Sequence, residues 1–140
     1  MMQGLSTDEI DLVRGSFDLI WAVAARTADS FYGRLFEIAP EVKPLFRRDM
    51  DEQKRKFMST LAVIVSSLDD SSKLTTLTST LAQQHGEFGV RVAHYEVVGK
   101  ALLWSLEQGL GPNWTPSVAA SWSKAYGLVS NFMIERRLCN

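Results

Sequence analysis

Apolar residues recur at the spacing of an α-helix along almost the whole of this chain. The first stripe consists of Ile10, Val13, Phe17, Ile20 and Ala24. Residues at this spacing share one face of a helix, and that face is buried against the rest of the protein. No segment alternates apolar and polar residues between hairpin turns, and the sequence contains no internal repeat. The sequence therefore predicts an all-α protein with about six or seven helices.

Caps and prolines mark where the helices begin and end. The Ser-Thr-Asp-Glu run at residues 6–9 has the pattern of a capping box, which begins the first helix. Pro40 and Pro44 end the second helical stretch and favour a short helical corner, because proline suits a first turn but not a helix interior. Asp51 is expected to cap the helix that follows this corner. Pro116 suits the first position of the last helix.

Composition limits both the size and the chemistry of the protein. A chain of 140 residues that is 46% hydrophobic suits one domain with its own core, over residues 1–140. Its formal net charge of -1 gives no electrostatic reason to expect nucleic acid or an anionic membrane as a partner. Cys139 is the only cysteine, which excludes an internal disulfide and fits a reducing compartment. Since no leader pattern and no long apolar run are found, we expect a cytoplasmic protein.

His85 is the residue on which the functional interpretation depends. It is one of only two histidines and follows Leu74, Leu77 and Leu81 at helical spacing, so its imidazole should point into the interior. Taken alone, such a histidine is more often a hydrogen-bonded core residue than a ligand. A neutral imidazole there, opposite a helix with a tyrosine and a glutamine, also meets the requirement for an axial ligand of haem iron.

Several motifs along the chain occur together in one known family. They are Phe31-Tyr32-Gly33-Arg34-Leu35-Phe36, Pro40-Glu41-Val42-Lys43-Pro44-Leu45-Phe46, Gln53, His85, His94-Tyr95, Val98-Gly99, Leu102-Leu103 and Trp122-Ser123-Lys124-Ala125-Tyr126-Gly127. In this order and spacing they resemble the globins, and more closely the bacterial single-domain globins and the haem domain of the flavohaemoglobins. The resemblance covers nearly the whole chain, and it implies a globin fold around one haem b.

The resemblance assigns roles to five residues around that haem. His85 would be the proximal histidine that binds the iron, with its second ring nitrogen held by a nearby acceptor. Phe46 would wedge against the haem face. Tyr32 and Gln53 would be the distal polar residues, and Phe57 would be the apolar residue over the iron. Taken alone, Tyr32 could be a core tyrosine, and Gln53 could be a solvated position near the start of its helix.

The proximal side departs from the flavohaemoglobin pattern. Tyr95 matches a tyrosine that joins the axial histidine and a glutamate in a hydrogen-bonded group, although a structural role at the start of its helix is equally open. The position of that glutamate is Arg137 in this chain. The nearest carboxylate, Glu135, lies two residues away on a different face of the helix. His94 is expected to be a cap or surface residue without iron contact.

These residues also lead to an expected function. A haem iron held by one histidine has an open position for oxygen, nitric oxide or carbon monoxide, and a tyrosine and a glutamine can stabilise oxygen by hydrogen bonds. Tight oxygen binding suits nitric oxide dioxygenation, an activity that the flavohaemoglobin resemblance implies. No glycine-rich dinucleotide motif occurs in this sequence, so a separate reductase is expected to supply the electrons.

Two other functions stay open at this stage. A non-enzymatic oxygen store or a gas sensor would have the same pocket, although no output domain accompanies it here. A globin-fold protein without haem would act through protein contacts alone, but the presence of Phe46 and His85 argues against it.

Overall fold

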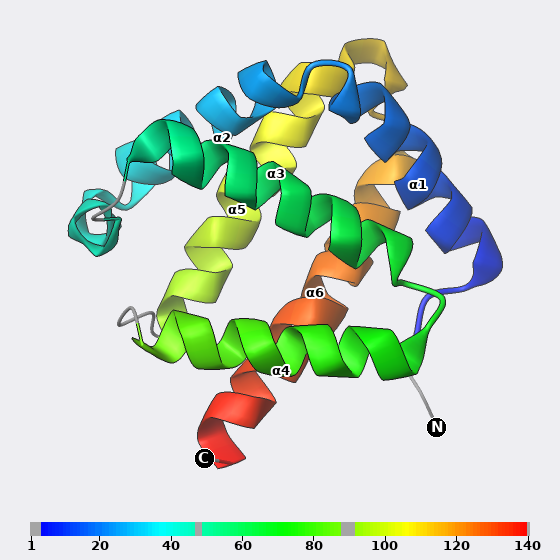
Figure 1. The fold of residues 1–140 in the computed structure, drawn as a ribbon. Coiled ribbons are helices and arrows are strands. Elements are labelled where there is room, and N and C mark those ends of the chain that lie inside the picture. Colours follow the sequence, from blue (N-terminus) through cyan, green and yellow to red (C-terminus); the bar gives the residue numbers. More distant parts are fainter. Residues whose placement is uncertain (1–3, 47–48, 88–91, 140) are drawn as a thin grey trace.

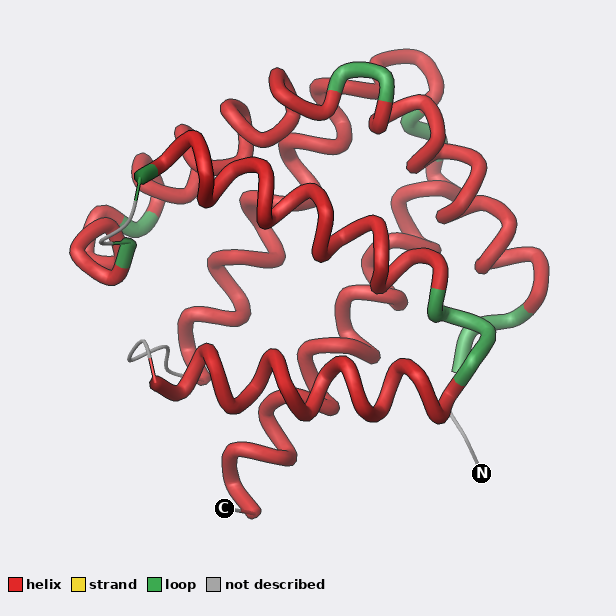
Figure 2. Tube along the Cα trace, in the orientation of Figure 1, coloured by secondary structure: helices red, strands yellow, loops and turns green. Residues whose placement is uncertain are grey.

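The computed structural model describes residues 4–46, 49–87 and 92–139, and helices make up almost all of this part of the chain (Figure 1). In chain order the helices are α1 (Thr7–Trp21), α2 (Ala24–Ile38), η1 (Pro40–Leu45), α3 (Met50–Ser66), α4 (Ser71–Glu87), α5 (Val92–Leu110), η2 (Gly111–Asn113) and α6 (Pro116–Cys139). The two η elements are short 3-10 helices. These ranges contain no strand, as Figure 2 shows, so the predicted all-α class is confirmed.

The start of α1 has the bonds that its sequence predicts. The hydroxyl oxygen of Ser6 accepts a hydrogen bond from the backbone N–H of Glu9 at 3.1 Å, and the Glu9 carboxylate accepts one from the backbone N–H of Ser6 at 2.8 Å. Together these bonds form a complete capping box, which satisfies amides that a helix start otherwise leaves without partners. Lys124 of α6 also lies 3.1 Å from the Glu9 carboxylate. The box therefore ties the start of α1 to the last helix.

The corner between α2 and α3 contains the two prolines. Pro40 and Pro44 both lie in η1, where the sequence predicts a helical corner. The prediction that Asp51 caps the next helix is wrong. The backbone N–H of Asp51 donates to the side chain of Asp49 at 2.9 Å, which makes Asp49 the cap and places Asp51 inside α3. A capping side chain accepts from amides in the first turn, so it must precede them in the sequence.

The main helix contacts pair α2 with α5, α4 with α6, and α1 with α6 (Figure 1). Gly109 allows α5 to lie close to the junction of α1 and α2. A Cβ atom at this position would lie 2.8 Å from Ile20 Cδ1 and 3.3 Å from Thr27 Oγ1. Any larger residue at this position would have to displace its neighbours. The close crossing of these helices therefore requires a glycine.

A buried hydrogen bond joins α1 to α6. The indole Nε1 of Trp122 donates to the hydroxyl oxygen of Ser16 at 2.8 Å. The Ser16 hydroxyl itself donates to the backbone carbonyl of Leu12 at 2.7 Å. Both buried polar groups are therefore satisfied, as is usual for polar groups in a protein interior. The pair fixes the position of Trp122 relative to α1.

Arg14 of α1 joins the end of α3. Its Nε donates to the carbonyl of Val65 at 3.2 Å, and its Nη2 donates to the carbonyl of Ser66 at 2.8 Å. The last carbonyls of a helix have no partner within the helix, so the guanidinium supplies the missing donors. The same guanidinium lies 2.9 Å from Asp69 and lowers the pKa of that carboxyl. Helix α3 is thereby fixed to α1.

Candidate functional site

A cavity of about 340 Å³ lies in the interior of the protein. Side chains of α2, η1 and α3 form one part of its wall, and side chains of α5 and α6 form another. Most of the residues that line it are apolar. They include Phe31, Leu35, Val42, Leu45, Leu61, Ile64, Leu81, Val98, Leu102, Trp122, Val129 and Met133. The cavity therefore suits a ligand with an apolar body.

Tyr32 of α2 belongs to a group of aromatic rings that lines the cavity. Its ring centroid lies 4.8 Å from that of Phe31 and 5.4 Å from that of Phe46, both in edge-to-face contacts. Phe57 packs against Tyr32 at 5.7 Å and stacks on Phe31 at 4.2 Å, with an interplanar angle of 10°. Phe36 completes the group at 5.9 Å from Tyr32. Contacts on several sides hold the Tyr32 ring in one orientation.

The hydroxyl of Tyr32 meets the side chain of Gln53 of α3. Gln53 Nε2 donates to the Tyr32 hydroxyl oxygen at 3.3 Å. Tyr32 is only 3% exposed, and this burial raises the pKa of its hydroxyl to about 12, against a smaller lowering by the Gln53 hydrogen bond. The hydroxyl therefore keeps its hydrogen at neutral pH. Since the hydroxyl oxygen accepts from Gln53, that hydrogen can be donated to another acceptor in the cavity.

Tyr95 and Tyr126 form part of the wall that α5 and α6 contribute. The Tyr126 hydroxyl donates to the backbone carbonyl of Tyr95 at 2.5 Å, and burial raises the pKa of Tyr126. Gly99 of α5 makes room for this contact, because a Cβ atom there would lie 2.6 Å from Tyr126 Cε2. The side chain of Tyr95 is buried beside Val129 and Met133 of α6. This part of the wall is therefore tightly packed.

Two basic residues line the cavity and were not predicted to do so. Lys56 lies on α3, three residues after Gln53, and His94 lies in the first turn of α5. His94, which the sequence predicts to be a cap or surface residue, is partly exposed and also lines the cavity. The described lining residues include no carboxylate. Helical spacing from Gln53 could have identified Lys56, whereas no sequence signal pointed to His94.

The side chains of three predicted residues lie outside the part of the protein that is described. The backbone of His85 belongs to α4, and the backbones of Glu135 and Arg137 belong to α6. Leu81, which precedes His85 by about one helical turn, lines the cavity. Residues four apart share a helix face, so this contact is what the predicted position of His85 requires. Axial ligation by His85 stays a prediction.

Comparison with known proteins assigns the family. The model of the globin family matches residues 29–133. The chain belongs to the globin family. The flavohemoprotein of Chromobacterium violaceum is 29% identical to this globin over 133 residues, which cover 93% of the globin and 33% of the flavohemoprotein. The globin thus spans about a third of the length of this relative.

Family membership implies a haem and a gaseous ligand, and the cavity fits that group. Haem has a flat apolar body and an anionic edge. The apolar lining and the aromatic rings suit the body, whereas Lys56 and His94 are basic and no carboxylate opposes them among the described lining residues. The Tyr32 hydroxyl and the Gln53 amide supply donors. A separate finding is that no described helix of this globin is long and apolar enough to cross a membrane.

Gly99→Ala is expected to lower the free energy of unfolding by about 1 to 3 kcal/mol, because the added methyl group collides with the Tyr126 ring. Gly127→Ala is the matched control, since a Cβ atom there meets nothing within 4 Å. It should raise the stability by about 0.5 to 1 kcal/mol, because alanine favours a helix. Urea unfolding measures both effects. Equal stability of the two variants would contradict the close contact at Gly99.

Tyr32→Phe is expected to flatten the loss of stability at alkaline pH. The pKa of this hydroxyl rises from an ordinary value of 10.0 to about 12 on folding. The stabilising contribution is therefore complete below pH 10.0 and is lost as the pH rises towards about 12, because the unfolded state releases its proton first. Urea unfolding of both proteins across this range measures the difference in slope. If the free energy of unfolding of the two proteins changes equally with pH, Tyr32 ionises in the folded protein as it does in the unfolded chain.

Proposed function

We propose that this globin binds haem b in the cavity, with His85 as the iron ligand, and that it binds oxygen tightly. We further propose that it converts nitric oxide to nitrate by dioxygenation. The observation that carries the proposal is the partly buried Tyr32–Gln53 hydrogen bond, which leaves the hydrogen of the buried tyrosine available inside an aromatic pocket. Family membership and the likeness to a flavohemoprotein support it.

Each wall of the cavity has its own part in holding the cofactor. When bound, haem supplies an iron with an open position for a diatomic ligand and a one-electron couple. Phe46 would pack against the macrocycle, and Phe57 would limit the space available to the ligand. Lys56 and His94 pair with the carboxylates at the edge of the cofactor, because they are the basic residues among the described lining residues. Tyr95 would help to orient the proposed iron ligand His85.

Tyr32 and Gln53 determine how strongly the ligand is held. A diatomic ligand that gains negative charge is a better hydrogen-bond acceptor, and a bond to a charged acceptor contributes about 1.5 to 3 kcal/mol. Each donor can therefore slow ligand release by roughly tenfold or more. The raised pKa of Tyr32 keeps this donor protonated over the whole physiological range. The aromatic group around Tyr32 fixes the direction of the donor before the ligand arrives.

Repeated turnover needs electrons from elsewhere. These 140 residues contain no glycine-rich dinucleotide motif. We therefore propose a reductase outside these residues as the partner. Oxygen, nitric oxide and carbon monoxide are the proposed ligands.

His85→Ala is expected to lose haem or to bind it weakly, because the chain then lacks the nitrogen that holds the iron. His94→Ala should keep the absorption spectra of the ferric, ferrous and carbonyl forms and weaken haem binding only modestly, because it removes a partner of the carboxylate edge and leaves the iron ligand in place. Haem titration followed by these spectra measures both. Equal haem retention with unchanged spectra in the two variants would overturn the assignment of His85.

Tyr32→Phe is expected to accelerate oxygen dissociation by about ten- to a hundredfold, because it deletes one donor and keeps the ring. Gln53→Leu should have a smaller effect in the same direction, and carbon monoxide release should change less.

Rapid mixing of the oxygen-loaded protein with nitric oxide should give nitrate in one fast turnover. A slow reaction with little nitrate would contradict dioxygenation and favour oxygen storage or gas sensing.

A further inference from the structure

A groove on the outside of α1 lies apart from the cofactor cavity. It has a volume of about 220 Å³ and lies between α1 and the residues where η2 leads into α6. Most of its lining residues belong to α1, and the others are Asn113 of η2 and Val118 of α6. None of them lines the cavity, and α1 runs along the edge of the fold in Figure 1. The groove is therefore a surface feature that is separate from the proposed haem site.

Four of the lining residues surround one point on the surface of α1. They are Leu12, Gly15, Ser16 and Leu19, at positions i, i+3, i+4 and i+7 of the helix. Side chains at these spacings are neighbours, and in coiled coils a side chain of the facing helix inserts between four such residues. Gly15 leaves the centre open, because a Cβ atom there would meet nothing within 4 Å. The spacing therefore forms a hole for one side chain of a second helix.

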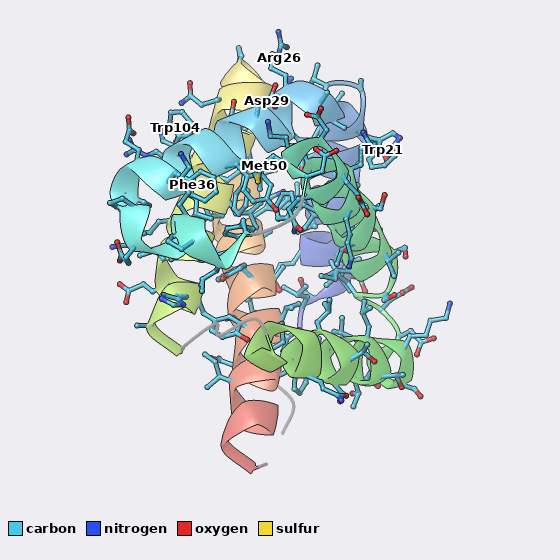
Figure 3. All side chains as sticks on the ribbon, turned by 60° about the vertical axis from the view of Figure 1, so that its left-hand side comes forward. Trp21, Arg26, Asp29, Phe36, Met50 and Trp104 are labelled. Carbon is cyan, nitrogen blue, oxygen red and sulfur yellow. The ribbon has the colours of Figure 1, made fainter. Side chains whose placement is uncertain are left out.

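Two leucines expose apolar surface at the ends of this hole. Leu12 is 36% exposed and Leu19 is 52% exposed, and they lie about 10 Å apart along the helix. Val118 of α6 is buried and adds apolar surface to the groove. Trp21 projects outward from the end of α1 in Figure 3 and does not line the groove. Covering the two leucines would remove apolar surface from water, which favours an apolar partner.

Only one edge of the groove carries charge. Asp11 and Asp18 are exposed and each precedes one of the two leucines, so helical spacing places both carboxylates on the side of the leucines away from Ser16. Among the described residues, no basic side chain lies within ion-pair distance of either carboxylate. The opposite edge, residues 113–118, contains no charged residue. A partner that fits this groove therefore needs basic residues along one edge of an apolar face.

We propose that this groove binds an amphipathic helix of another protein. The partner helix inserts an apolar side chain at Gly15 and places two basic residues, seven positions apart, beside Asp11 and Asp18. Apolar contact then provides the binding free energy, and the carboxylates fix the direction and register of the helix. The contact covers a small area, so the complex is reversible. This interaction is a property of the α1 surface and is independent of the proposed haem chemistry.

Two other occupants fit the groove less well. Two copies of the groove facing one another would bring four carboxylates together, and like charges at such an interface repel. No helix in the described part of the chain carries two basic residues seven positions apart, so a second copy lacks the matching helix. An anionic membrane would also be repelled by Asp11 and Asp18. Charge therefore favours a basic helix of a different protein.

A synthetic peptide tests the groove in the haem-loaded protein. The peptide has about 15 residues, is held helical by a side-chain cross-link, and carries leucines at helical spacing with two lysines seven positions apart. Fluorescence anisotropy of the labelled peptide measures its affinity, and nuclear magnetic resonance of the diamagnetic carbonyl form locates its site. We expect resonance shifts confined to α1, η2 and the start of α6. The same peptide with glutamates in place of the lysines should bind about tenfold more weakly or less well still.

Gly15→Leu should lower the affinity by about tenfold or more, because the new side chain fills the hole. Gly33→Leu is the matched control, since Gly33 is an exposed glycine of α2 outside the groove, where a Cβ atom also meets nothing within 4 Å. It should bind the peptide as the wild type does. Asp11→Asn combined with Asp18→Asn should lower the affinity about three- to tenfold at low salt and remove most of its salt dependence.

Several results would overturn the proposal. They are a wild type that does not bind the peptide, and equal affinities of the wild type and Gly15→Leu. Dimerisation of the wild type that Gly15→Leu abolishes would assign the groove to a second copy. Binding to vesicles of phosphatidylcholine and phosphatidylglycerol that Gly15→Leu abolishes would assign it to lipid. The absorption spectrum of each variant reports haem uptake separately, so failure of the groove is distinguishable from failure of the proposed function.

Discussion

An apolar space of about 340 Å³ lies where core side chains would otherwise pack against one another, and the rest of the fold is arranged around it. An apolar space left unfilled destabilises the folded state, because the side chains that line it lose packing contacts. A ligand that fits the cavity therefore stabilises the fold strongly. Cofactor binding and the stability of the domain are therefore thermodynamically coupled.

Polar contacts near the helix ends join three of the helices around the cavity, in addition to the apolar packing of the core. Arg14 joins the end of α3 to α1, and the capping box of α1 is joined to α6 through Lys124. The hydrogen bond from Trp122 to Ser16 holds α1 and α6 together beside the cavity itself. Fixing helices from their ends leaves the inward faces free to line the cavity. The hydrogen bonds from Gln53 to Tyr32 and from Tyr126 to the carbonyl of Tyr95 also join helices at the cavity.

Chemistry within the cavity comes from a few polar atoms on a mostly apolar wall. Burial keeps Tyr32 protonated, and packing between several aromatic rings holds its hydroxyl in place. Lys56 and His94 provide the basic part of the lining. A donor that is oriented in advance loses little entropy when a ligand arrives, so it stabilises the ligand more than a mobile side chain would.

Local chemistry in the sequence was sufficient to predict the helices, the capping box and the proline corner, because each depends on residues within a few positions of one another. The resemblance to globins also selected Tyr32, Phe46, Gln53, Phe57 and Tyr95, all of which line the cavity. The spacing of residues did not identify His94 as a lining residue, nor the contact between Gly99 and Tyr126. Those contacts depend on the crossing of helices that are distant in the sequence, and a helical pattern gives the face of a residue but not its partner on another helix. Only the tertiary structure decided which faces meet.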